Sequence, residues 1–529
     1  MPDPAALAWF GTDEPPAPRQ VLRAGALVAT LEAGGLRHVT WHGVEVVRGI
    51  AFVVRDTGWA TLAPEIVGLE IDERDGRFVV TYAARCAGPD GAFRFQARIE
   101  GGADGRLRFA AEGAAEGGAV ATNRIGFVML HPVAGVAGSP LTIEHGNGGT
   151  TRSHFPALIA PHAPATDIAA LHHAVAGWQV ACRFEGETFE MEDQRNWGDA
   201  SFKTYCRPLA RGFPYTIAPG EAVAQAVTLA IAGQAAAVAP VPPPRRFRMP
   251  RIALALDAAD ATPALAELVR ATGVGRILVR LDPLRTDLRK AAAALAAFDM
   301  PITLEPVIPA RDPEAELAAI AHAGIACDEV MPIALRDFVS RPTGTPAGEA
   351  DAAAIAQAAR RIFPGRRIIG GTPGFFTELN RNPPDAAGID GIQSAFCAIV
   401  HAADDISVME TLDALGDIGA SMAALAPGAE RRLATATITM RDSMDSPFPL
   451  PNPHRHRLAR AALDPRHAAG FGAAWATAFA RHAGAAGIDL VAPAMVTGPL
   501  GLLLPDGGVS PLFGAVQALA QAAGSVVEG

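Results

Sequence analysis

Charged and polar side chains gather near the carboxyl ends of short apolar segments in the second half of the chain. Arg280 lies at the end of one such segment, Glu305 lies in the next, and His401 follows a third (391–400). Carboxylates and imidazoles commonly move protons in catalysis, and a guanidinium stabilises developing negative charge. These residue types indicate a proton-transfer reaction such as hydrolysis, if the fold brings them to one cavity.

Two more segments of this half add candidates of the same kind. GFFTELNRNPP (374–384) carries Glu378 and Asn380, and TMRDSMD (439–445) carries Arg441. A lone Arg or Glu near a strand end is more often part of an ion pair than catalytic. Several such groups aimed at one cavity would instead bind a hydroxylated small molecule. The predicted catalytic residues are Glu378, Glu305 and His401, and the predicted substrate-binding residues of this half are Arg280, Asn380 and Arg441.

The first half contains one conspicuous polar stretch, FEMEDQRNWGDASFKTY (189–205). It can be interpreted as a solvated surface strand, as a site that is itself catalytic, as in sandwich domains that isomerise sugars, or as a loop at the open end of a second domain. We favour the loop, in which Trp197 stacks on a sugar ring while Arg195, Asn196 and Lys203 bind its hydroxyls, because an indole covers apolar C–H faces.

The sequence pattern of the first half predicts β-strands. From about residue 21 to 232 apolar residues mostly alternate with polar ones or form short runs. Gly, Asp and Asn interrupt these runs at the ~8–12-residue intervals typical of antiparallel strands. The pattern predicts an N-terminal antiparallel β-sandwich over residues 1–238. The Pro-rich segment APVPPPRRFRMP within 239–250 is predicted to be an extended linker.

Past this linker the period changes to short apolar runs that alternate with helix-spaced segments. RIALALD (251–257) followed by TPALAELVRATG opens a series of eight such units. Their number and spacing favour a (β/α)8 TIM-type barrel over residues 251–529, and no GxGxxG follows the first strand to support a dinucleotide fold. Asp404 and Asp405 are predicted to cap the helix that follows them. In a barrel the strand ends listed above share one rim, so the active site is predicted there.

Composition excludes several classes of partner. The net charge is -10 and the Lys and Arg residues are scattered, so nothing predicts a nucleic-acid surface. The N-terminus lacks a secretory pattern, and no apolar run approaches the ~20 residues of a membrane span. We therefore expect a cytoplasmic protein without membrane or nucleic-acid partners. The sequence sets no oligomeric state.

No metal or cofactor is expected either. The five cysteines are far apart without paired CxxC spacing, and HExxH is absent. A GxSxG nucleophile elbow is absent as well. The candidate chemistry therefore rests on Asp, Glu, His and Arg side chains.

Several long phrases resemble one known family. FEMEDQRNWGDASFKTYCRPL (189–209), NRIGFVMLHP (123–132), GFFTELNRNPP and VHAADDISVMETL (400–412) are similar to the D-apionate lactonases of bacterial apiose catabolism. The resemblance implies that the protein hydrolyses D-apionolactone to D-apionate. Its substrate would then be a small-molecule sugar lactone. It also implies that relatives carry more chain after the barrel, so any C-terminal β-domain is reduced or missing here.

Two other functions stay open at this point. A glycoside hydrolase would use Glu305 and Glu378 as its carboxylate pair, with a separation of about 5–5.5 Å in a retaining enzyme. A non-catalytic carbohydrate-binding protein would bind the ligand without turnover. For the lactonase, Glu378 or Glu305 is the predicted base, and the other carboxyl or His401 is the predicted acid. Arg280 and Arg441 are the predicted partners of the oxyanion and of the product carboxylate.

Overall fold

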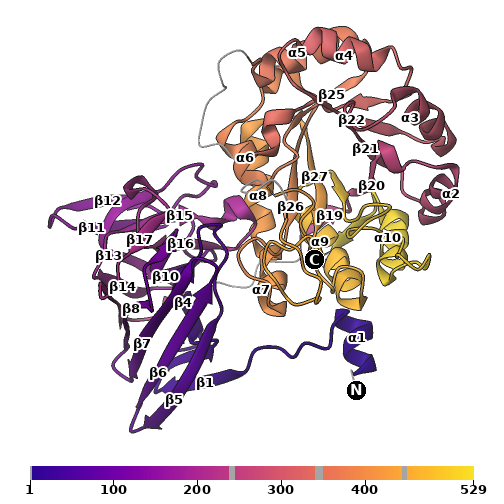
Figure 1. The fold of residues 1–529 in the computed structure, drawn as a ribbon. Helices are drawn as coiled ribbons and strands as arrows, with labels where there is room; N and C mark the ends of the chain where they lie inside the picture. Colours follow the sequence, from indigo (N-terminus) through magenta and orange to yellow (C-terminus); the bar gives the residue numbers. More distant parts are fainter. Residues whose placement is uncertain (1–2, 237–244, 340–348, 444–448, 529) are drawn as a thin grey trace. The chain divides into compact units, whose positions relative to one another are not determined.

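The computed structural model describes residues 3–236, 245–339, 349–443 and 449–528 (Figure 1). Contacts divide the chain into two compact units. The β unit comprises residues 16–194 and 200–242, and the barrel unit comprises residues 1–15, 195–199 and 243–529. The short segment 195–199 thus belongs to the barrel unit, although the sequence analysis placed it in the first domain.

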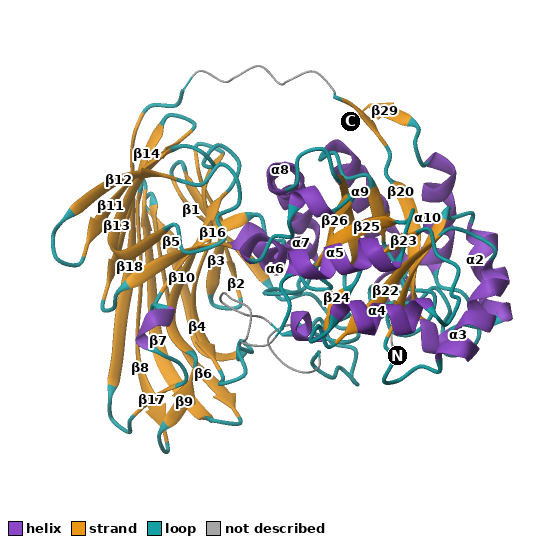
Figure 2. Cartoon of the chain, turned by 90° about the horizontal axis from the view of Figure 1, so that it is seen from above, coloured by secondary structure: helices purple, strands orange, loops and turns teal. Residues whose placement is uncertain are grey.

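The β unit consists almost entirely of strands (Figure 2). Its strands are β1 (Arg19–Ala24), β2 (Leu27–Glu32), β3 (Gly35–Trp41), β4 (Val44–Arg55), β5 (Pro64–Arg74), β6 (Arg77–Gly88), β7 (Gly91–Gly102), β8 (Arg106–Glu116), β9 (Val120–Thr122), β10 (Arg124–Pro132), β11 (Pro140–His145), β12 (Thr150–His154), β13 (Ala165–Val175), β14 (Trp178–Glu185), β15 (Phe189–Asp193), β16 (Ser201–Tyr205), β17 (Tyr215–Ile217) and β18 (Ala222–Gly233). Within the described residues, sixteen of them form one antiparallel sheet, and β9 pairs with β17.

The sheet folds on itself because its alternating strands have one apolar face. Strand β6 alternates strictly between buried and more exposed positions, as expected for a half-buried strand. Phe52 of β4 packs on Phe95 of β7, with ring centroids 4.8 Å apart, and Phe127 of β10 packs on Phe109 of β8 at 4.9 Å. Strands from distant parts of the sheet therefore share one core, and the predicted antiparallel β-sandwich is confirmed.

The barrel unit alternates strands and helices. Its strands are β19 (Arg246–Arg248), β20 (Arg251–Asp257), β21 (Arg276–Leu281), β22 (Ile302–Ile308), β23 (Glu329–Val330), β24 (Ile333–Ala334), β25 (Arg367–Gly371), β26 (Gly391–Cys397), β27 (Glu430–Thr437), β28 (Leu490–Ala492) and β29 (Val526–Glu528). Its α-helices are α1 (Pro4–Phe10), α2 (Pro263–Thr272), α3 (Leu288–Leu295), α4 (Pro313–Ala321), α5 (Ala352–Ile362), α6 (Phe376–Arg381), α7 (Asp405–Glu410), α8 (Leu415–Leu425), α9 (Gly470–Ala485) and α10 (Pro511–Ala522).

Parallel pairing closes the barrel. Strands β20 to β28 each pair with their neighbours, β20 pairs with β28, and β23 and β24 together occupy the fourth strand position beside β22. The predicted (β/α)8 barrel is therefore confirmed. The predicted linker over 239–250 lies partly outside the described residues, and its later part forms β19, which pairs with β29.

Side-chain caps set several helix starts, as the sequence pattern indicates. Asp404 accepts a hydrogen bond from the backbone N–H of Ser407 at 2.9 Å, at the start of α7. Asp287, Asp312 and Asp351 cap α3, α4 and α5 in the same way. The capping role predicted for Asp404 is confirmed. None of the described helices is both long and apolar enough to cross a membrane.

Buried ion pairs fill the amino-terminal end of the barrel. Glu329 is 1% exposed and lies 2.8 Å from Arg432, 3.1 Å from Arg276 and 2.7 Å from Arg367. Glu430 is paired with Arg432 and Arg367 at 2.7 Å each. Arg276, Glu329, Arg367 and Glu430 are each the first residue of their strand. These side chains are engaged in ion pairs with one another, and barrels of this type carry their chemistry at the opposite, carboxyl end.

Two histidines are buried in the core of the β unit. His131 of β10 and His173 of β13 have ring centroids 5.6 Å apart, and both nitrogens of His173 lack a hydrogen-bond partner among the described residues. Burial, with a smaller contribution from His172, lowers the pKa of His173 from 6.5 to about 4. Burial also lowers the pKa of His131 well below its ordinary value. Both rings are therefore neutral in the folded unit.

We predict that the β unit loses stability in mild acid. An unfolded histidine binds a proton below about pH 6.5, whereas folded His173 does so only near pH 4. The contribution of His173 to the free energy of unfolding is fully present above pH 6.5 and falls by roughly 3 kcal/mol as the pH approaches 4. Urea unfolding from pH 7.5 to 4.5 measures this slope. His173→Phe should flatten it, whereas the same change at exposed His154 should not; equal slopes in parent and His173→Phe would refute the assignment.

Candidate functional site

A polar cluster occupies the carboxyl end of the barrel interior. Arg280 of β21 lies opposite Glu305 of β22 in the strand register, with Arg280 Nε 4.0 Å from Glu305 Oε2. Gln393 of β26 donates from Nε2 to Glu305 Oε1 at 2.9 Å. Strands β22 and β26 are not neighbours, so side chains that meet between them must point into the barrel. Glu305 and Arg280 therefore face the lumen, as predicted.

Two aspartates from the lumen rim complete this cluster. Asp442 accepts from Nη1 of Arg280 at 2.8 Å, and Asp257, the last residue of β20, accepts from Nη2 of Arg441 at 2.9 Å. Burial opposes the charge on Arg280, but Asp442 and Glu305 outweigh it and raise the pKa of Arg280 above its ordinary value. The guanidinium is thus a permanent positive charge beside a carboxylate.

Not every polar atom of the cluster is paired. Within the described part of the chain, Arg280 Nε has no hydrogen-bond acceptor and Gln393 Oε1 has no donor, and both atoms are buried. Buried polar groups are nearly always hydrogen-bonded. The unpaired donor of Arg280 and the unpaired acceptor of Gln393 therefore indicate a site for a polar ligand beside Glu305.

A second cluster surrounds Trp197 in the barrel unit. The Nδ1 atom of His401, which follows β26, lies 2.5 Å from Oδ2 of Asp199. The Trp197 ring packs edge-on against His401, with centroids 5.8 Å apart, and against Phe375 at 6.3 Å. Arg381 of α6 lies 5.8 Å from the centroid of the Trp197 ring. Because the carboxylate accepts from Nδ1, Asp199 sets the orientation and the tautomer of the His401 ring.

Residues 195–199 are attached to the barrel by polar contacts. Arg195 is fully buried and its Nη1 lies 3.0 Å from Oδ2 of Asp417 on α8. Asn380 of α6 donates to Asn196 at 2.9 Å. These contacts within the barrel unit hold Trp197 and Asp199 at the loops that follow β25 and β26. The solvated-strand interpretation of this stretch is therefore wrong for Arg195 and Asn196, which are buried.

Glu378 has different surroundings. It lies on α6, is 7% exposed, and lines a cavity of about 240 Å³. The same cavity is lined by Arg336, Asp351 and Asn382. Glu378 and Glu305 thus stand on different elements among different neighbours. The role predicted for Glu378 stays a prediction.

The structure groups the predicted residues as follows. Arg280 and Glu305 belong to the lumen cluster, Arg441 is tied to its rim, and His401 contacts Trp197. Asn196 contacts Asn380, and Arg195 is engaged by Asp417. The sequence analysis missed Asp199 as a partner of His401, together with Gln393 and Asp257, and it did not choose Asp442 although this residue follows Arg441 directly. Asp199 stands two residues after Trp197 in the quoted stretch and could have been chosen there; nothing in the spacing marks Gln393.

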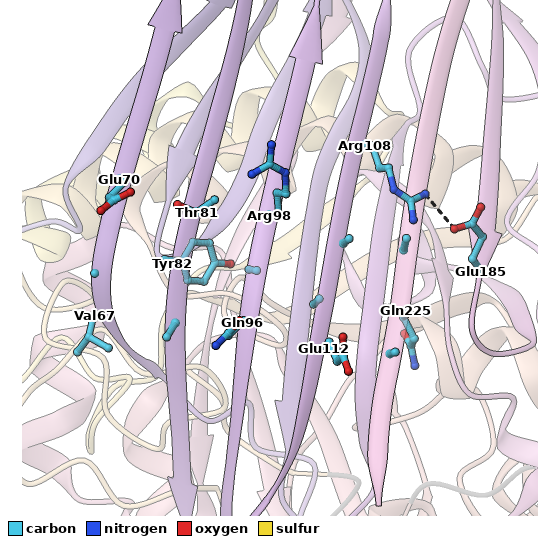
Figure 3. A pocket seen from close by; sticks show the side chains of 17 residues that line it. Val67, Glu70, Thr81, Tyr82, Gln96, Arg98, Arg108, Glu112, Glu185 and Gln225 are labelled. Carbon is cyan, nitrogen blue, oxygen red and sulfur yellow. Dashed lines mark hydrogen bonds and ion pairs between the residues drawn. The ribbon is translucent and has the colours of Figure 1, made fainter.

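A shallow depression on the β unit fits a ligand less well. It has a volume of about 810 Å³ and is lined by side chains of neighbouring strands, among them Glu70, Arg98 and Glu112. Figure 3 shows these side chains spread along the sheet rather than converging on one point. Arg108 is paired with Glu185 at 2.9 Å, as the dashed line marks. Such a polar sheet face is typical of a solvated surface.

No group of three or more His, Cys, Asp or Glu side chains that could hold a metal ion is found in the ranges that the structure describes. All five cysteines are buried free thiols.

Comparison with known proteins matches both units to one family. The model of the D-apionate lactonase N-terminal domain matches residues 7–234, and that of the D-apionate lactonase TIM barrel domain matches residues 251–524. The chain belongs to the D-apionate lactonase family. A D-apionate lactonase from Brucella anthropi is 36% identical to it over 99% of this chain and 90% of its own length.

Solved structures resemble the chain only weakly. A galactose mutarotase-like protein from Clostridium acetobutylicum is 10% identical and matches 41% of this chain and 99% of its own, with a TM-score of 0.28. A glycoside hydrolase family 5 enzyme from Prevotella bryantii is 9% identical and matches 49% of this chain and 86% of its own, with a TM-score of 0.34. Likenesses of this size carry no functional argument.

We predict that Asp417 fixes the segment 195–199 of this lactonase family member. Asp417→Asn removes the negative charge beside a fully buried guanidinium, and the loss of a charged hydrogen bond costs about 2 kcal/mol. Amide hydrogen exchange of a peptide that spans 195–199 should accelerate, as followed by mass spectrometry. Asp299→Asn, an exposed change in the same unit, is the control. Exchange that is unchanged in Asp417→Asn would show that other contacts hold the segment.

Proposed function

We propose that this chain hydrolyses D-apionolactone to D-apionate in bacterial apiose breakdown. Membership of the D-apionate lactonase family across both units supports the reaction class. The observation that carries the proposal is the lumen cluster, where Arg280 lies between Asp442 and Glu305 at the end of the barrel that hosts chemistry. A ring lactone is rich in hydroxyls and carries a carbonyl, so side chains that donate and accept hydrogen bonds suit it.

The arginines suit the charge that develops during the reaction. Attack of water on the lactone carbonyl places negative charge on the carbonyl oxygen. Arg280 keeps its charge in the buried lumen, and its Nε lacks an acceptor among the described residues. We assign Arg280 to this oxyanion. Arg441, tied to Asp257 at the rim, is assigned to the carboxylate of the product.

Two groups are assigned to the proton transfers. Glu305 lies beside Arg280 and is oriented by the bond from Gln393, so it is assigned to deprotonate the attacking water. When the ring C–O bond breaks, the departing oxygen must receive a proton. His401 is assigned to deliver it from Nε2, while Asp199 fixes the tautomer through Nδ1. The products are one carboxylate and one hydroxyl.

The substrate-binding assignments are divided between two roles. Trp197 presents an aromatic ring beside His401 and is proposed to pack on the sugar ring, and Asn380 with Asn196 is proposed to bind its hydroxyls. Arg195 is fully buried and engaged by Asp417. We therefore assign it an anchoring role in place of the predicted contact with substrate.

We predict that variants of the assigned catalytic groups hydrolyse D-apionolactone more slowly than the parent, as measured by acid release in a pH-stat. Removal of a proton-transfer group or an oxyanion donor should lower kcat by about 10²–10⁴-fold in Glu305→Gln, Arg280→Met and His401→Ala. Glu314→Gln on the exposed face of α4 is the matched carboxylate control and should change little. Glu378→Gln tests the second predicted base: a greater loss there than in Glu305→Gln would move the base to Glu378.

A second assay, which follows release of the phenol from aryl glycosides, tests the alternative function. Aryl glycosides and other aldonolactones are offered beside D-apionolactone. Turnover of the glycosides with no acid release from any lactone would refute the proposed reaction and favour the glycoside hydrolase. Binding without turnover of either would favour a carbohydrate-binding protein.

We also predict that Asp199 acts through His401. Asp199→Asn should lower kcat about 10- to 100-fold with little change in KM. It should also move the alkaline limb of the pH–rate profile to lower pH, because a carboxylate beside an imidazole favours the protonated ring that acts as the acid. His401→Ala in the Asp199→Asn background should cost little more than His401→Ala alone. Additive losses and an unmoved profile would give Asp199 a purely structural role.

A further inference from the structure

A buried arginine in the β unit lacks a counter-charge. Arg124, the first residue of β10, is 3% exposed, and its Nε is buried without an acceptor. In the part of the chain that the structure describes, no carboxylate is paired with it. Its guanidinium instead lies 3.8 Å from the ring centroid of Tyr205 and 5.3 Å from that of Trp59. Aromatic faces stabilise a cation only partly when it is removed from water.

Two more cations lie beside Arg124. Arg55 of β4 stands directly opposite it in the antiparallel register. The Nζ of Lys203 on β16 lies 5.0 Å from the centroid of the same Tyr205 ring. Burial lowers the pKa of Lys203 to about 8. The nearby Glu192 raises this pKa, whereas the positive charges of Arg124 and Arg55 lower it further. Like charges directly opposite each other destabilise a sheet unless something compensates them.

The nearby carboxylates are committed to other groups. Glu192 lies 2.8 Å from Nζ of Lys203. Glu190 accepts from the Tyr205 hydroxyl at 2.6 Å and from the backbone N–H of Leu209 at 2.8 Å. Positive charge therefore remains in excess at Arg124. An unpaired guanidinium in such a place is the recognition group for a planar anion.

We propose that Arg124, with Arg55 and Lys203, forms an anion site in the β unit that binds the carboxylate of a sugar acid. The guanidinium takes the carboxylate oxygens, and Trp59, which is only partly buried, offers an apolar face to the C–H groups of the sugar chain. The choice of a sugar acid rests on the proposed function, whose product is one. Inorganic phosphate shares the same anion chemistry and is the other source to be tested.

Calorimetric titration of the full chain tests the site. D-Apionate and inorganic phosphate are titrated separately into Arg441→Met, which lacks the arginine assigned to the product carboxylate in the barrel. We expect D-apionate to bind, and its Kd to rise at least tenfold when Arg124→Gln is added. Arg94→Gln, an exposed arginine on β7 of the same unit, is the matched control and should leave the Kd unchanged.

Thermal unfolding distinguishes a binding role from a structural one. Removal of an uncompensated buried charge should not lower the unfolding midpoint of Arg124→Gln, and D-apionate should raise the midpoint of the parent more than that of the variant. A lowered midpoint with unchanged D-apionate affinity would make Arg124 a structural brace and overturn the proposal. Phosphate binding without D-apionate binding, or no binding of either, would overturn it too. Retained D-apionate binding in a parent that hydrolyses no lactone would refute the proposed function alone.

Discussion

Closure of the parallel sheet is the constraint on which the candidate site depends. Because β20 pairs with β28, the strands form a ring, and side chains from opposite strands are forced to meet in its interior. The bond between Glu305 and Gln393 exists only for this reason. An open sheet of the same strands would place these side chains far apart. The ring therefore supplies both the low-dielectric interior and the convergence that proton transfer requires.

The polar clusters of the molecule differ in how completely they are paired. At the amino-terminal end of the barrel, Glu329 and Arg432 belong to a network in which each arginine has a carboxylate partner. At the carboxyl end, Arg280 retains an unmatched donor, and in the β unit Arg124 has aromatic rings where a carboxylate would be expected. Structural ion pairs supply each guanidinium with a carboxylate, as they do for Arg432, whereas Arg124 has none among the described residues. This difference separates the proposed site of the β unit from the barrel floor.

The high charge of the stretch 189–205 is explained by the partners that its charged side chains have in the two units. Lys203 is paired with Glu192 within the β unit. Arg195 is paired with Asp417, and Asp199 contacts His401, within the barrel unit. A short run of sequence thus contributes to both units, and the charges beside Trp197 are tolerated because they have fixed partners. Burial of such groups without them would cost several kcal/mol each.

The sequence by itself determined the two-domain architecture, since periods of two and 3.6 residues are local properties that burial selects. It also determined that Arg280, Glu305, His401 and Arg441 are candidates, because barrel topology assigns strand ends to one rim. Only the tertiary structure decided the partners. Gln393 meets Glu305 across the lumen, and Asp199 reaches His401 from two hundred residues away in sequence. Such contacts depend on strand register and loop path, which no local pattern encodes.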